Sequence, residues 1–549
     1  MALVTGWVQR PKYKKGLDPL GVQQPCIAVY SALLPGITNV TDRIIYFGFG
    51  PWFVWSYAQR YTKTTASNFI DMLRRAEVLL TLIGVRHAIV SDDGLPDQHD
   101  GALVGVDTLR KVVVNARANA VIQLSQYATL DDVDERYFKN RRGGLGQYYL
   151  GPSRDEYQLL GEREGRVIDF TIERGQPMAQ SVAAGVDSEK FFQCLEEDRA
   201  SIRDLDSLSA FCPCQLRTKG RTSERTLLLD TVVGLQTGLS RNAETRRRSL
   251  ELLIDFLKTS DGCEAPDGAE DTFLVGCYAR VLPSGKRWSP PACLAGAADV
   301  WAFYLRGELL SLAMQRLFRE ALLTIDSHDP KVLTVEAAGR WCASMDPFRK
   351  VIQAKGTTYN GLLASTRLGL PQLGNVEHKC HEIALWEAVL NGAAGSLATV
   401  DAAVGLILSL LARHQGGSFT IARAIGANPI RLENYPINLD TVFGRAQTRW
   451  PGMTMADWMV DILCWILGAH RQVALRKLSQ SGDDTRRLRM GEDTLYVDGD
   501  IIEVARTVPR LRQALRFLED LGLTSRGHPG RLPIPTRHAL NVIQQSHAI

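Results

Sequence analysis

Hydrophobic positions along most of this chain recur with the period of an α-helix. In TASNFIDMLRRAEVLLTLIGVRHA the apolar residues fall on one helical face, and Thr65 or Ser67 can cap the helix. Between about residues 187 and 465 the pattern is almost wholly helical, as in TRRRSLELLIDFLKTS and ADVWAFYLRGELLSLAMQRLFREALLTI. We therefore expect a mainly α, multidomain helical protein.

An aromatic segment, RIIYFGFGPWFVWSYAQRY, starts at Arg43 and is suited in principle to a membrane, a ligand or a core. A spanning helix needs about 20 apolar residues, whereas this uncharged run is shorter and is interrupted by two glycines and Pro51. A helix that is apolar all round is a buried helix, and few basic residues flank this one for base stacking. We predict a buried aromatic helix with Pro51 in its first turn.

A second stretch with a single charged residue, 388–412, has the length of a membrane span. It contains Asn391, Gly395 and Asp401, and an aspartate at mid-bilayer is energetically costly. We predict two buried helices with a break near Gly395, and no membrane segment.

Two segments show the element order of a winged helix, which is a helical core followed by a β-hairpin. The segment TLDDVDERYFKN predicts a helix, which is followed by a glycine-rich turn and a second helix. After these, GRVIDFTI alternates apolar and polar residues like a strand and precedes another helix. Near the C-terminus, TVPRLRQALRFLEDLGL predicts an amphipathic helix, and GEDTLYVDGDIIEV predicts a small hairpin around Asp498 and Gly499. We expect one or two winged-helix-like modules that carry short β-hairpins.

These patterns divide the chain into four expected domains. They are an N-terminal helical domain with the aromatic helix (1–128), a winged-helix-like module (129–186), a central helical body (187–465) and a basic winged-helix-like module (466–549).

The composition is that of an ordinary soluble protein, with 45% hydrophobic and 23% charged residues and a net charge of +4 over 549 residues. Ten cysteines are scattered, and the N-terminal residues lack the apolar core of a signal peptide. We expect reduced thiols and a cytoplasmic location.

No nucleotide-binding or hydrolase motif is present, because neither GGLGQYYLG nor LPSGKRW fits a phosphate loop and no G-x-S-x-G turn occurs. The catalytic residues are therefore unknown, and a non-enzymatic role is favoured. A metal-dependent nuclease using Asp92, Asp93 or Asp97 stays open, although the loop that holds them, together with Asp100, is expected to be solvated.

Metal ligands are weakly indicated. Cys212 and Cys214 are two residues apart, and a second group lies far along the chain at His378, Cys380 and His381. Structural zinc sites usually pair two closely spaced knuckles, and nothing in the sequence shows that these two groups meet. We expect no cofactor and assign no metal site, with buried thiols and a histidine pair at a helix start as the simpler interpretation.

Basic residues concentrate toward the C-terminus, where the last 79 residues hold 13 lysines and arginines against nine aspartates and glutamates. Such a patch suits a phosphate backbone, an acidic protein partner or plain solvent exposure. The candidate nucleic-acid-binding residues, which include a basic group beside the first expected wing, are Lys139, Arg141, Arg142, Arg510, Arg512, Arg516, Arg526 and Arg531.

The segment GLDPLGVQQPCIAVYSALLPGITNVTDRIIYFGFGPWFVWSYAQRY and the segment GGLGQYYLGPSRDEYQLLG resemble parts of large uncharacterised bacterial proteins from anti-phage defence or mobile-element loci. The resemblance covers about the first third of the chain and a stretch near Arg476 to Val497. It implies a cytoplasmic bacterial protein that acts with partner subunits, and it implies no reaction.

Our leading hypothesis is a non-catalytic subunit that binds double-stranded DNA or another nucleic acid, or assembles a defence complex. The alternatives are the nuclease and a protein-interaction scaffold.

Overall fold

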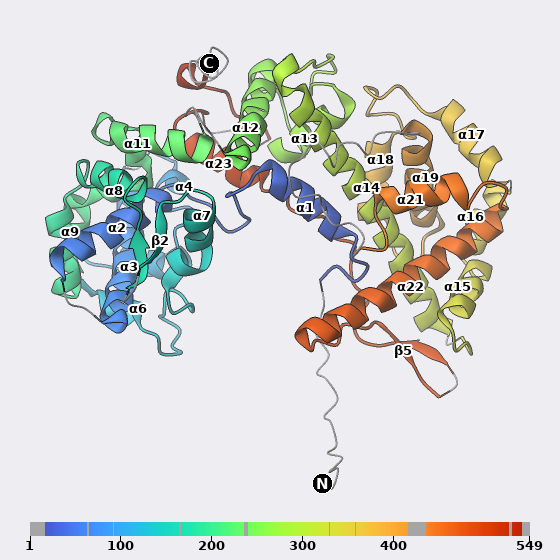
Figure 1. Cartoon of the computed structure of the whole chain (residues 1–549), viewed down its shortest axis with the longest axis horizontal. Helices are drawn as coiled ribbons and strands as arrows, with labels where there is room; N and C mark the ends of the chain where they lie inside the picture. The colour runs from blue at the N-terminus through green and yellow to red at the C-terminus, as the bar shows by residue number, and fades with distance from the viewer. Residues whose placement is uncertain are drawn as a thin grey trace, which may run out of the picture. The chain divides into compact units, whose positions relative to one another are not determined.

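The computed structural model describes residues 17–62, 65–91, 93–163, 166–234, 240–328, 330–356, 358–414, 435–492, 494–525 and 530–540 (Figure 1). It is mainly α-helical, as predicted. Within the described residues the strands form three antiparallel pairs, β1 with β4, β2 with β3 and β5 with β6.

Contacts within the chain divide it into two compact units. We name Leu34–Glu270 with Pro509–Ile549 the aromatic unit, and Met1–Leu33 with Asp271–Val508 the helical unit. This division cuts the expected 187–465 body at Glu270 and the expected 466–549 module at Val508.

The aromatic unit contains short helices around two long ones. Its elements are α2 (Tyr46–Arg60), α3 (Ala66–Ser91), α4 (Pro96–His99), α5 (Val106–Val114), β1 (Val121–Gln123), α6 (Leu124–Ala128), η1 (Leu145–Tyr149), α7 (Leu150–Asp155), β2 (Leu160–Arg163), β3 (Arg166–Phe170), α8 (Gly175–Ala183), α9 (Ser188–Glu196), β4 (Arg199–Ser201), α10 (Ile202–Ser207), η2 (Ser209–Phe211), η3 (Pro213–Arg217), η4 (Lys219–Arg221), α11 (Thr222–Leu228), η5 (Leu229–Val233), α12 (Arg241–Ser260) and α23 (Leu511–Asp520).

The helical unit is built around one long helix, α14, which packs against α1, α18, α19 and α22. Its elements are α1 (Gln23–Leu33), α13 (Ala269–Ala279, which begins in the aromatic unit), α14 (Ala292–His328), α15 (Val335–Ser344), α16 (Phe348–Lys355), α17 (Tyr359–Gly369), α18 (Glu382–Asn391), α19 (Leu397–Arg413), α21 (Leu439–Thr448), α22 (Met455–Ser481), β5 (Leu488–Met490) and β6 (Leu495–Val497).

The aromatic segment is core, as the sequence predicted. Trp52 and Phe53 of α2 are completely buried, and Trp52 packs edge-on against Phe191 of α9. The helix begins at Tyr46, earlier than expected, so Pro51 lies inside it. Gly48 and Gly50 permit close packing, because a Cβ at Gly50 would lie 2.8 Å from Leu145.

Two buried charged side chains of α3 determine the path of residues 128–145. Arg74 is fully buried and donates hydrogen bonds to the carbonyl oxygens of Ala128, Thr129, Phe138 and Asn140. Glu77, one turn further along α3, accepts hydrogen bonds from Tyr137 Oη and from the backbone N–H groups of residues 144 and 145.

This arrangement replaces the helix expected in TLDDVDERYFKN, because residues 129–142 form turns and bends. Carbonyl groups that a helix would bond internally are instead bonded by the Arg74 guanidinium. The hairpin expected around Asp498 and Gly499 also differs, since the chain turns between Met490 and Leu495.

The weakly charged stretch at 388–412 contains parts of two helices, as predicted. The helix α18 ends at Asn391, α19 begins at Leu397, and Gly395 lies between them with a positive φ of 70°. No helix among the residues that the structure describes is long and apolar enough to cross a membrane.

We predict that replacing Arg74 by Met loosens residues 128–145, because four carbonyl oxygens lose their buried donor. Unpaired buried polar groups cost about 1–3 kcal/mol each, so the loss at four carbonyl oxygens should lower the local opening free energy by at least about 4 kcal/mol. Hydrogen–deuterium exchange of these amides should then accelerate roughly thousandfold. Arg141→Met in the same segment, where the side chain is exposed, should leave exchange unchanged. Equal exchange in both variants would contradict this role of Arg74.

Candidate metal centre

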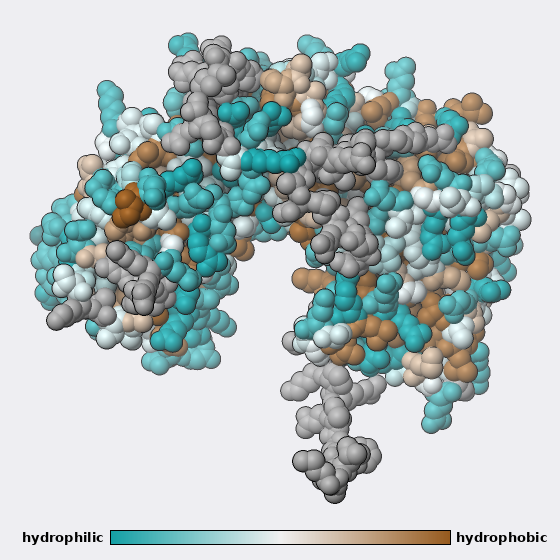
Figure 2. Space-filling model, in the orientation of Figure 1, coloured by the Kyte–Doolittle hydropathy of each residue, from teal (hydrophilic) through white to brown (hydrophobic). Residues whose placement is uncertain are grey.

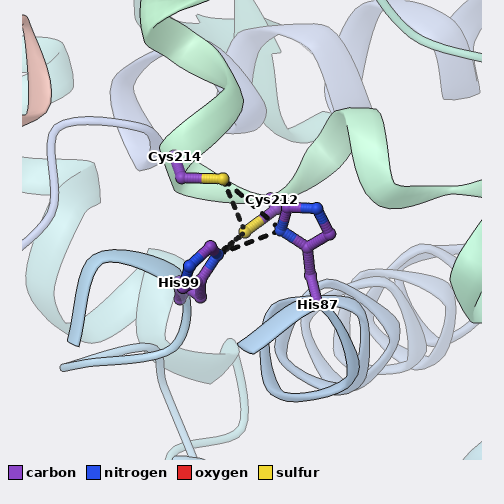
Figure 3. Close-up of side chains that lie close together, drawn as sticks. All are labelled: His87, His99, Cys212 and Cys214. Carbon is purple, nitrogen blue, oxygen red and sulfur yellow. Dashed lines mark hydrogen bonds between the residues drawn. The ribbon is translucent and has the colours of Figure 1, made fainter. Parts of the chain in front are cut away.

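Four side chains from separate parts of the aromatic unit converge on one point (Figure 3). His87 lies on α3, His99 ends α4, Cys212 precedes η3, and Cys214 lies within η3. Their nearest nitrogen and sulfur atoms all lie within 4.8 Å of one another. Such a set of two imidazoles and two thiols is one of the ligand sets of tetrahedral zinc sites.

Four of the six distances between these atoms lie close to the edges of a zinc tetrahedron. Zn–S bonds of about 2.3 Å and Zn–N bonds of about 2.05 Å place two sulfurs about 3.8 Å apart, two nitrogens about 3.3 Å apart, and sulfur about 3.5 Å from nitrogen. The two Sγ atoms are 3.5 Å apart, and the two Nδ1 atoms are 3.0 Å apart. Cys212 Sγ lies 3.4 Å from His99 Nδ1, and Cys214 Sγ lies 3.4 Å from His87 Nδ1. These four distances are slightly shorter than the corresponding edges of a loaded site, and all six lie within 4.8 Å.

Local sequence brings the two histidines together. Gly84 lies one turn before His87 on α3, and a Cβ there would meet the carbonyl oxygen of His99 at 2.9 Å and Leu103 at 2.5 Å. A glycine is therefore needed for α4 to approach α3 this closely. Pro96 begins α4 at a position that lacks an intrahelical partner in any case.

The sequence Cys-Pro-Cys directs both sulfurs to the same point. Cys212 is extended, with φ −61° and ψ 138°, and Pro213 then begins the 3₁₀-helix η3. The fixed φ of proline makes this turn rigid, which places Cys214 beside Cys212.

A buried arginine holds the histidine loop in place. Arg43 is 1% exposed and donates hydrogen bonds to the carbonyl oxygens of Asp97, Gln98 and Gly101, which surround His99. Its charge is balanced by Asp520 of α23 at 3.0 Å.

Asp93 orients the His99 ring from outside the cluster. Its Oδ2 lies 3.0 Å from His99 Nε2, and its Oδ1 accepts a hydrogen bond from the backbone N–H of Leu95. A proton on Nε2 that is donated to Asp93 leaves the Nδ1 lone pair directed at the cluster, as in the carboxylate–histidine pairs of metal sites. The hydrogen bond from His99 also lowers the pKa of Asp93.

The two thiols differ in their ionisation. The pKa of Cys214 is lowered to about 4, first by its hydrogen bond with Cys212 and also by the hydrogen bond with His87, whereas burial raises the pKa of Cys212. The hydrogen bond with Cys214 raises the pKa of His87. A thiolate at Cys214 is therefore favoured without metal, and an ion would displace the remaining protons because metals bind thiolates and neutral imidazoles.

The site is closed. His99 is 2% exposed and Cys212 is fully buried, while His87 and Cys214 are half-buried. Four protein ligands complete a tetrahedron and leave no position for a substrate, which is typical of structural and not of catalytic zinc.

Cys212 and Cys214 were candidates from the sequence, whereas His87 and His99 were not. The other group that it named lies in the helical unit, where His381 caps α18 by accepting the N–H of Ile383 and its Nε2 contacts the carbonyl oxygen of Leu373. The proline between the two cysteines is the one available signal of a rigid pair. Two histidines 12 residues apart, such as His87 and His99, are too common a pattern to indicate a site.

The aspartates of the loop considered for a nuclease differ in their exposure to solvent. Asp93 contacts His99 and Asp97 is exposed, but Asp100 is 2% exposed and pairs with Arg110. The expectation of a fully solvated loop was therefore wrong for Asp100, which is drawn inward beside the Arg43 contacts. Asp92 lies outside the described residues.

The candidate nucleic-acid residues occupy several environments. Lys139, Arg141 and Arg142 are exposed on the segment fixed by Arg74, and Arg512 and Arg531 are exposed. Arg510 donates a hydrogen bond to the carbonyl oxygen of Ile37, and Arg516 lies 3.9 Å from Asp42 with 19% of its side chain exposed. Arg526 lies outside the described residues.

Comparison of the chain with protein-family models, with curated proteins and with solved structures finds no match.

We predict that Asp93→Asn weakens metal binding without abolishing it. Loss of an outer carboxylate typically costs tenfold to hundredfold in metal affinity, and the zinc dissociation constant from chelator competition should rise by that factor. Asp107→Asn, an exposed carboxylate at the start of α5, is the matched control and should not change it. An unchanged affinity in Asp93→Asn would show that Asp93 does not orient His99.

Proposed function

We propose that the aromatic unit is a zinc-dependent module in which His87, His99, Cys212 and Cys214 hold one structural Zn²⁺. The observation that carries this proposal is the convergence of the four ligand atoms within 4.8 Å. Thiolate and imidazole ligands together favour zinc over the oxygen-preferring Mg²⁺ and Ca²⁺.

The ion would connect the neighbouring helices α3 and α4 to the η2–η3 turn, which lies far along the sequence from both. Within this unit α3, α4 and the η2–η3 turn meet at the cluster, where α4 also packs directly against η3. A metal that binds only the folded state adds its binding free energy to stability. Its role in this proposal is to fix the geometry of the unit, and no reaction is assigned to it.

We predict that the purified chain contains about one zinc ion and that the double variant Cys212→Ser/Cys214→Ser contains essentially none, by elemental analysis. The melting temperature of the native protein should fall on treatment with a strong chelator, and the melting temperature of the double variant should not respond. Cys380→Ser removes an exposed thiol of the helical unit and should keep the full zinc content. Equal zinc in the double variant and the wild type would refute the site.

A second function, binding of nucleic acid by a subunit of a bacterial anti-phage defence complex, is favoured by the basic segment at Lys139, Arg141 and Arg142. Arg74 bonds the carbonyl oxygens on either side of Lys139, and Asn140 Oδ1 accepts the N–H of Arg142. A backbone fixed in this way directs the three cationic side chains outward with little freedom to lose on binding. The exposed acids at 131–135 precede this group, and Arg136 pairs with one of them, Asp132, so the phosphate contact is confined to 139–142.

Two segments of the aromatic unit, one around β2–β3 and one after α23, support the same proposal because each follows a helix with an antiparallel backbone pairing. The hairpin β2–β3 follows α7 and precedes α8. After α23, Thr524 pairs with Pro535 in an antiparallel bridge, and Ser525 donates its N–H to Ile534. Arg512 on α23 and Arg531, which forms an isolated antiparallel bridge with Glu264, are the exposed cations of the second segment. Double-stranded DNA, other complex subunits and a cytoplasmic location remain part of this proposal.

We predict that the triple variant Lys139→Ala/Arg141→Ala/Arg142→Ala binds a DNA duplex more weakly whatever its sequence. Each lost phosphate contact should reduce the slope of log affinity against log salt by about 0.9, so three contacts remove about 2.7. Electrophoretic mobility shifts over a salt series measure both quantities.

The matched control is Lys331→Ala/Arg340→Ala/Lys379→Ala, which removes three exposed cations of the helical unit. A salt slope that is the same in both triple variants, with normal zinc content, would exclude residues 139–142 as the contact. Zinc content that stays at one ion while DNA binding is absent would separate the two proposals.

A further inference from the structure

The helical unit contains a cavity of about 320 Å³ beside the β5–β6 hairpin. Its walls come from the second half of α22, the start of α15 and the hairpin itself. Hydrophobic surface is visible around this end of α22 in Figure 2. The volume lies at the lower end of the range of small-molecule sites.

One wall is a single face of α22. Leu467, Arg471 and Leu475 follow one another at intervals of four residues, which places them in one row along the helix. The opposite wall comes from the hairpin. Leu488 and Met490 are two residues apart on β5 and share one face, and Leu495 is paired with Met490 in register.

The walls remain partly open to solvent. Leu333 is 45% exposed, Leu475 44% and Met490 60%, and all three line this cavity. Isolated exposed apolar residues are common, but a contiguous group around a concave surface marks a binding site.

The polar part of the cavity carries an excess of positive charge. Arg486 is held by Asp484 through two hydrogen bonds, from Nε at 2.9 Å and from Nη2 at 2.8 Å. Arg489 pairs with Asp484 and with Asp498. Among the described residues Arg471, the third arginine at the cavity, has no carboxylate partner. Three guanidinium groups therefore face two carboxylates, and one positive charge is left beside an apolar wall.

We propose that this cavity binds a small amphipathic monocarboxylate, an apolar chain that ends in one carboxylate group. The carboxylate would pair with the Arg471 guanidinium, which offers planar donors in a fixed fork. The apolar chain would lie between the leucines of α22 and the β5–β6 hairpin and remove them from water. This inference is independent of the metal centre and of nucleic-acid binding.

Decanoate is the test probe, titrated into the full-length protein by isothermal titration calorimetry below its micelle concentration. We expect one saturable site with a dissociation constant of about 1 mM or tighter. Butyrate, which keeps the carboxylate and lacks the chain, and decyltrimethylammonium, which keeps the chain and reverses the charge, should each bind at least about tenfold more weakly.

Two variants locate the site. Arg471→Met removes the charge and keeps an apolar stem, and it should weaken decanoate binding by at least about tenfold. Leu475→Asp places a carboxylate in the apolar wall and should abolish binding. Both positions are exposed enough to fold normally, which circular dichroism verifies. Arg367→Met is the matched control for loss of an exposed arginine elsewhere in the helical unit and should bind decanoate as the wild type does. No saturable binding, equal binding of the cationic probe, or an unchanged affinity in Arg471→Met would each overturn the proposal.

Discussion

The buried guanidinium of Arg43 is the interaction on which the arrangement of the aromatic unit depends. It is 1% exposed, and burying a charge costs several kcal/mol unless its hydrogen bonds and counter-charge are nearly complete. Asp520 and three carbonyl oxygens supply them. Because those carbonyls belong to the loop of His99 and Asp520 belongs to α23, one side chain fixes both a metal ligand and a helix from the far end of the chain.

The same principle recurs at Arg74, which is satisfied by four backbone carbonyl oxygens. In both places a guanidinium organises irregular backbone that has no sheet or helix to bond to. Arginine in this unit is thus partly an internal scaffold. The exposed cations at 139–142 owe their fixed positions to a buried one, so the proposed contact with nucleic acid depends on the interior of α3.

Periodic segments were predictable from the sequence because burial of one face is a local property. The amphipathic α23 follows from the spacing of its apolar residues, and the buried aromatic helix and the two helices around Gly395 follow from their local composition. The expected helix in 129–140 failed because its carbonyl groups are taken by Arg74, more than fifty residues away. The number of C-terminal arginines likewise overestimates the exposed positive charge. Arg487 is fully buried, and Arg489 is 8% exposed and pairs with two carboxylates.

The metal ligands were the least predictable part for a reason that also bears on how the site forms. His87 and His99 are separated by 12 residues, but Cys212 follows His99 by 113. The entropic cost of closing a loop grows as (3/2)RT ln n, so closing the long one costs about 2 kcal/mol more than closing the short one. This difference is small beside the binding free energy of a structural zinc ion, roughly 10–16 kcal/mol. The ion can therefore stabilise a cluster of distant ligands, but it cannot choose among ten cysteines and ten histidines in an unfolded chain. That choice is made by contacts that do not involve the metal, namely the close approach permitted by Gly84, the rigid turn at Pro213 and the anchor of the His99 loop at Arg43.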